Sequence, residues 1–73
     1  MWDVVKGQHF KKLRRKTGFS QIQLAKAMGY STKQVIFYVE SGRQEPTPKF
    51  RTQALKSFRK RMPNLKLGDI FLD

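Results

Sequence analysis

The chain has 73 residues, one histidine and no cysteine, and its 16 Lys and Arg against 5 Asp and Glu give a net charge of +11. This length supports one small core, so we expect a single domain over residues 1–73. Disulfides, thiolate metal sites and a zinc site built by one histidine are excluded. No apolar run is long enough for a membrane span, and no signal-peptide pattern is present, so we expect a cytoplasmic, nucleoid-associated protein.

The positive charge is the strongest global signal. Self-repulsion of this size destabilises a compact domain, and a polyanionic partner is its natural explanation. Nucleic acid is the first candidate and an anionic membrane the second.

The first predicted helix runs from about Val4 to Lys16. Phe10, Leu13 and Arg14 are spaced i, i+3 and i+4, which puts Arg14 at the edge of the buried stripe. The intervening cations form a basic face toward solvent, and they are Lys11, Lys12, Arg15 and Lys16. Gly18 suits the left-handed position that ends a helix.

Two further helix starts follow closely. Ser20 with Gln23 forms a capping box, and Ser31 with Gln34 repeats it eleven residues later. Gly29 lies between them, which predicts a short helix, a tight turn and a second short helix ending near residue 41.

The remaining segments also have the helical period. Thr47 is the expected N-cap of a helix that starts with Pro48 and runs to about Met62. Residues 65–72 suggest one last short helix. No segment alternates as a strand does, so we predict an all-α, compact bundle of about five short helices with a central helix-turn-helix at about residues 20–41.

Two segments of this helix-turn-helix are distinctive: LRRKTGFSQIQLAKAMGYS and VESGRQEP. Together they resemble the lambda-repressor-like (XRE) family of DNA-binding domains, of Cro and phage-repressor type. The resemblance covers about residues 7–72. The residues that carry it are Leu13, Arg14, Gly18, Ser20, Gln21, Leu24, Ala25, Gly29, Ser31, Glu40, Gly42 and Pro46.

The resemblance implies that a recognition helix at about residues 32–40 lies in the major groove of double-stranded DNA. It implies an ion pair between Arg14 and Glu40. The implied phosphate contacts are Gln21, Arg43, Gln44 and Lys49, and the implied base contacts are Thr32, Lys33, Gln34 and Phe37. It also implies a homodimer on a near-palindromic operator, for which the candidate interface residues are Leu67, Ile70 and Phe71.

Each base-contact residue has its own chemistry. Lys33 can donate to guanine O6 and N7, and Thr32 can contact a phosphate or a thymine methyl. The side chain of Gln34 has two candidate roles: it closes the capping box, or it recognises adenine. Because residues 35–39 are all apolar and span every face of a helix, at least one faces outward, and Phe37 is predicted to do so against thymine methyls or sugars.

One departure from the family leaves the helix register open. Glu40 lies eleven positions after the turn glycine, one more than is usual in that family. One register, counted from the N-terminal side, buries Val35 and Tyr38; the other, counted back from the glycine after the helix, buries Ile36 and Val39. The second capping box favours the first register at the helix start, with the extra residue absorbed in the turn or near the helix end.

The functional prediction is a sequence-specific transcriptional regulator, and in particular a repressor that acts by occupying its operator. An antitoxin-type autorepressor with a toxin partner and a protein-interaction adaptor with the same fold are the alternatives. Five scattered carboxylates and one histidine without a partner do not form a catalytic constellation, so no enzyme activity is expected. No cofactor, metal, small-molecule ligand or membrane partner is expected either.

Overall fold

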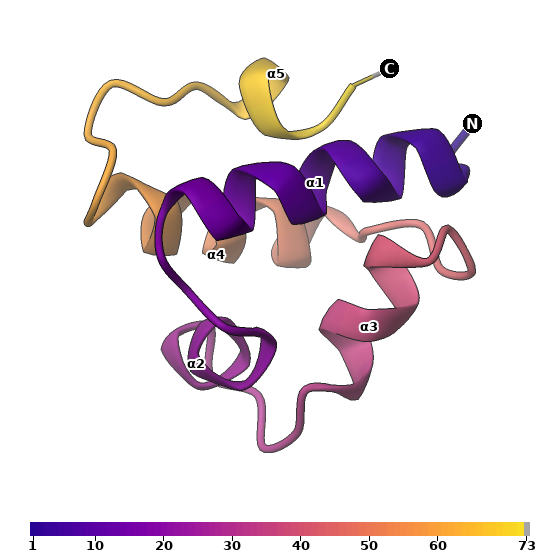
Figure 1. Ribbon diagram of the computed structural model, residues 1–73, viewed down its shortest axis with the longest axis horizontal. Coiled ribbons are helices and arrows are strands. Elements are labelled where there is room, and N and C mark those ends of the chain that lie inside the picture. Colours follow the sequence, from indigo (N-terminus) through magenta and orange to yellow (C-terminus); the bar gives the residue numbers. More distant parts are fainter. Residues whose placement is uncertain (73) are drawn as a thin grey trace.

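The computed structural model describes residues 1–72, and its ribbon is shown in Figure 1. Within that range it has no strand and five helices: α1 (Val4–Lys16), α2 (Gln21–Ala27), α3 (Gln34–Glu40), α4 (Pro48–Arg59) and α5 (Leu67–Ile70). In Figure 1 α1 crosses the middle of the molecule, with α4 behind it, α5 above and the α2–α3 pair below. The predicted all-α bundle with a central helix-turn-helix is confirmed.

The core is largely aromatic, and Phe10 of α1 lies at its centre. Its fully buried ring lies 5.5 Å from the ring of Phe58, 5.7 Å from that of Phe50 and 5.7 Å from that of Phe71, measured between centroids. Tilted rings at such distances attract through their quadrupoles in addition to burying apolar area. This cluster joins α1, α4 and the segment after α5, which gives the α2–α3 pair a rigid support.

Several local signals act as the sequence predicts. The Ser20–Gln23 capping box is formed, because Ser20 Oγ accepts from the Gln23 amide and Gln23 Oε1 accepts from the Ser20 amide. Thr47 caps α4, with Pro48 at its first position. Gly18 has a φ of +83°, the left-handed conformation expected after α1.

The second predicted capping box is wrong, and the register it favoured is wrong as well. α3 begins at Gln34, and the residue before it supplies no side-chain cap. The Gln34 side chain instead donates to the hydroxyl of Tyr38, at 3.1 Å. Ile36 and Val39 are the fully buried apolar residues of α3, whereas Tyr38 is only half-buried. The extra residue therefore lies in the turn before α3.

The reason is that α1 fixes the C-terminal end of α3. A Cβ on Gly7 would lie 2.4 Å from the carbonyl oxygen of Glu40, and one on Gly42 would lie 2.5 Å from the amide nitrogen of Val4. Trp2 Nε1 also donates to the carbonyl oxygen of Val39, at 2.9 Å. With this end held by backbone contacts, only the start of α3 can accommodate an inserted residue.

A buried ion pair joins the same two helices. Arg14 Nε donates to Glu40 Oε2, and Arg14 Nη2 lies 3.2 Å from Glu40 Oε1. Arg14 Nη1 donates to the carbonyl oxygen of Phe19, at 2.8 Å. Both side chains are more than nine-tenths buried, so the charges have each other and protein dipoles in place of water. The ion pair implied by the family resemblance is therefore present.

Replacing Gly7 by Ala should destabilise the protein by about 1–3 kcal/mol or more. The added methyl meets the backbone of α3, which cannot move aside as a flexible side chain can. Gly68→Ala in α5 is the matched control, because its Cβ meets nothing within 4 Å, and a neutral or slightly stabilising effect is expected. Urea unfolding followed by circular dichroism measures both, and equal effects would contradict the close approach of α1 and α3.

A double-mutant cycle should show strong coupling between Arg14 and Glu40. Each of Arg14→Met and Glu40→Gln leaves its partner without a counter-charge in the core and should cost about 3–5 kcal/mol. The double variant should lose clearly less than the sum of the two. Additive losses in thermal or urea unfolding would mean that the two side chains do not interact.

Candidate nucleic-acid interface

The outer face of α3 presents polar and aromatic side chains at its start. Lys33 and Gln34 are exposed, and Phe37, one turn later, is 45% exposed. An α-helix with its side chains is about 10–12 Å in diameter, which fits a major groove about 12 Å wide. Because Ile36 and Val39 are on the opposite face, the register decided by α1 determines which residues point outward.

One flank of α3 is a hollow between α1, α2 and the start of α3. It is lined by Lys11, Arg14, Arg15, Ser20, Gln21, Ile22 and Lys33. Gln21 Nε2 donates to Glu40 Oε1 at 3.0 Å, which orients the amide. An amide nitrogen carries two hydrogens, so the second can donate to another acceptor such as a phosphate oxygen. The buried ion pair thus positions a polar side chain of this hollow.

Lys11 and Arg15 were not predicted to belong to this flank. Their spacing of four residues places them on one face of α1, which is visible in the sequence. The sequence does not reveal that this face adjoins Gln21, because that depends on how α1 packs on α2 and α3.

The opposite flank is the loop between α3 and α4. Arg43 and Gln44 of this loop are exposed, as is Lys49 in the first turn of α4. The backbone amides of Arg43 and Gln44 lie 3.0 and 3.3 Å from the carbonyl oxygen of Tyr38, which fastens the loop to the end of α3. The guanidinium carbon of Arg43 lies 5.9 Å from the ring centroid of Phe37, so this cation stays beside the outer face of α3.

The predicted contact residues therefore gather around one helix. Phe37 lies on the outer face of α3, Gln34 begins that helix, and Thr32 and Lys33 lie in the turn before it. Of the candidate phosphate contacts, Gln21 lines the hollow on one flank, Arg43 and Gln44 lie in the loop on the other, and Lys49 lies in the first turn of α4. Gln34 lies with Tyr38 on the flank nearer Gln44, since all three line one hollow. The Gln34 side chain donates to the Tyr38 hydroxyl and does not close the predicted capping box with Ser31.

The candidate dimer interface is wrong for two of its three residues. Ile70 and Phe71 are buried, and the ring of Phe71 packs 6.1 Å from that of Trp2 as well as on the central phenylalanines. They fill the space above α1 and are unavailable to a second chain. Leu67, 43% exposed, is the member of that set that remains at the surface.

Three of the four carboxylates in residues 1–72 serve the protein's own structure, and the fourth, Glu45, is exposed in the loop between α3 and α4. Asp3 caps α1, Asp69 accepts from the Lys66 amide at the start of α5, and Glu40 is paired with Arg14. Neither hollow beside α3 is lined by a carboxylate. Within residues 1–72, no group of three His, Cys, Asp or Glu side chains is arranged to hold a metal, and no helix is long and apolar enough to cross a membrane.

Comparison with known proteins agrees with this geometry. A family model described as helix-turn-helix matches residues 10–50, more than half of the chain, from the middle of α1 to the first turn of α4. No curated protein and no solved structure gives a significant match. The chain belongs to the Cro/C1-type (XRE) helix-turn-helix family of DNA-binding regulators.

Proposed function

We propose that the protein is a sequence-specific transcriptional regulator that represses by occupying its operator. The observation that carries this proposal is the start and outer face of α3, where Lys33, Gln34 and Phe37 are exposed beside two flanks that present cations and amides. An α-helix fits the major groove, and the two phosphate backbones border that groove on either side. The arrangement of α3 and its flanks matches this shape and its charge.

In this mechanism, one group of residues recognises bases and another positions α3 on the phosphate backbone. Lys33 donates to guanine, Gln34 reads adenine, Thr32 contacts a thymine methyl or a phosphate, and Phe37 packs against thymine methyls. Phosphate contacts by Gln21 on one flank and by Arg43, Gln44 and Lys49 on the other set the depth and register of α3 without reading sequence. A protein bound in this way over a promoter excludes polymerase and therefore represses transcription.

We further propose that two copies bind one near-palindromic operator. Half-sites read by dimers of this motif are one helical turn apart, about 34–36 Å. The protein measures 27 × 26 × 20 Å, so two copies on adjacent turns come close while sharing only a small interface. With Ile70 and Phe71 buried, Leu67 is the remaining candidate contact. Such a homodimer assembles on DNA, and the complex resides in the cytoplasm with the nucleoid.

An adaptor function is the second candidate, and one observation favours it. Phe37 is 45% exposed, and its ring lies 5.9 Å from that of the half-buried Tyr38, so α3 carries an aromatic pair that a protein partner could cover. The cations on both flanks favour DNA instead. The antitoxin alternative loses support, since a toxin partner needs an exposed docking surface, and the apolar C-terminal residues Ile70 and Phe71 are buried.

Lys33→Ala and Arg43→Ala should affect DNA binding differently. Lys33→Ala should cost about 1–3 kcal/mol of affinity for the preferred sequence and relax the preference at one base pair. Arg43→Ala should weaken binding to all sequences similarly and reduce the slope of log K against log salt concentration by about 1. Selection from a random duplex pool, followed by fluorescence anisotropy at several salt concentrations, measures both effects.

Lys56→Ala on α4 is the control for these variants, since it removes one exposed cation outside both flanks of α3. If Lys33→Ala keeps the affinity and base preference of the unmodified protein, α3 is not the reading helix. If the unmodified protein selects no sequence at all, the regulator proposal fails and the adaptor remains.

The selected sequences should contain two inverted half-sites whose centres are 10–10.5 base pairs apart or a multiple of that spacing. The stoichiometry of the complex, measured by analytical ultracentrifugation on a labelled duplex, should be two chains per site. A single asymmetric site bound by one chain would overturn the dimer part of the proposal.

A further inference from the structure

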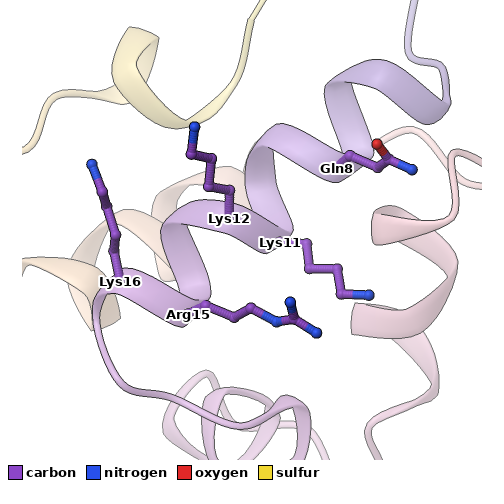
Figure 2. A pocket seen from close by; sticks show the side chains of 5 residues that line it. All are labelled: Gln8, Lys11, Lys12, Arg15 and Lys16. Carbon is purple, nitrogen blue, oxygen red and sulfur yellow. The ribbon is translucent and has the colours of Figure 1, made fainter.

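The exposed face of α1 carries a second group of cations beside the α3 region. Lys11, Lys12, Arg15 and Lys16, with Gln8, line a shallow hollow along this helix. Figure 2 shows their side chains in two rows: Lys11 and Arg15 extend toward the side of α2 and α3, and Lys12 and Lys16 extend the other way. We call these four cations the α1 strip.

The α1 strip is not neutralised by the protein's own carboxylates. Across residues 1–72, no ion pair or hydrogen bond joins any of its four side chains to another group, and no acidic residue lies three or four positions from any of them. Within the strip, Lys11 and Arg15 are like charges at i and i+4, as are Lys12 and Lys16. Each such pair destabilises a helix by a few tenths of a kcal/mol, so the strip is unfavourable until an anion binds.

The strip is continuous with the proposed DNA contact surface. Lys11 and Arg15 line both the hollow on α1 and the neighbouring hollow that contains Gln21 and Lys33. Because no carboxylate lines either hollow, a polyanion that touches Lys33 and Gln21 can continue over α1. This continuity favours one partner, the phosphate backbone of the duplex that α3 reads, over a separate anionic surface.

We propose that the α1 strip binds phosphates of the duplex beyond the base pairs read by α3, so that the footprint extends outward past the half-site. The proposal rests on the proposed function, because it needs α3 docked in a duplex. Lys12 and Lys16 are about 6 Å apart along the helix axis, and a strand carries one phosphate per 3.4 Å of duplex. The two lysines therefore match about two phosphates, which add salt-dependent affinity without adding sequence preference.

The test compares two lengths of the selected duplex, one cut at the outer edge of the half-site and one extended by a further helical turn. The unmodified protein should bind the extended duplex more tightly and with a steeper dependence on salt. Lys12→Gln/Lys16→Gln should reduce the slope of log K against log salt by about 2 on the extended duplex. On the trimmed duplex the same variant should leave the slope nearly unchanged, and the base preference should be retained on both.

Lys56→Gln/Lys60→Gln is the matched control, because it removes the same charge from two exposed lysines, again four residues apart, that line a different hollow. Its effect should be smaller and independent of duplex length. Equal effects of the two double variants, or an α1 effect of the same size on both duplexes, would overturn the proposal. The proposal would also be overturned if Lys12→Gln/Lys16→Gln lost binding to phosphatidylserine vesicles while its binding to the duplex stayed unchanged, because the strip would then bind a membrane.

Failure of the α1 strip proposal is distinguishable from failure of the proposed function. If α3 variants change base preference but the α1 double variant behaves like the control, the regulator proposal stands and the strip proposal fails. If no preferred sequence is selected, the regulator proposal fails. The strip is then tested on mixed-sequence duplexes, where an unchanged salt slope for Lys12→Gln/Lys16→Gln overturns it.

Discussion

The buried pair between Arg14 and Glu40 is the interaction on which the arrangement of the helix-turn-helix depends. Arg14 also donates to the carbonyl oxygen of Phe19, and Glu40 also accepts from the side chain of Gln21, so one ionic group connects α1, α2 and α3. A deeply buried ion pair adds little to the free energy of unfolding compared with well-packed apolar residues in the same place. Removing one partner, however, strongly destabilises the fold. Its main consequence here is geometric, because it holds the end of α3 at one depth and orients an amide beside it.

The small number of carboxylates and their positions also explain the positive charge of the surface. The acidic side chains at positions 3, 40 and 69 cap helices or pair inside the protein, which leaves the cations along α1 without a paired carboxylate. Glu45, exposed in the loop between α3 and α4, is the acidic residue of the described chain that lies beside the cations around α3. A chain with a net charge of +11 then presents a predominantly positive surface, and a polyanion relieves the repulsion within it. The positions of these few carboxylates therefore affect both the stability of the fold and the charge of the proposed binding surface.

Local patterns were reliable where all the partners lie within a few residues. Ser20 and Gln23 close a capping box because both belong to the same helix start and α2 has no competing constraint there. The same pattern at Ser31 and Gln34 failed, because α3 is positioned from its other end and the inserted residue had to lie in the turn. The prediction of Ile70 as an interface residue is wrong for a related reason, since the sequence pattern of an apolar side chain near a chain end is the same whether a partner or the protein's own core covers it.

The helical class, the order of the helices, the family and the charge of the partner follow from the amino-acid sequence alone, because periodicity, caps and net charge depend on neighbouring residues or on simple sums. The tertiary structure decided which residues of α3 face outward, since Gly7 allows the backbones of α1 and α3 to approach within contact distance. It also decided that the basic face of α1 adjoins Gln21 and Lys33. These outcomes depend on contacts between segments far apart in the chain, and no local pattern encodes the distance at which two helices pack.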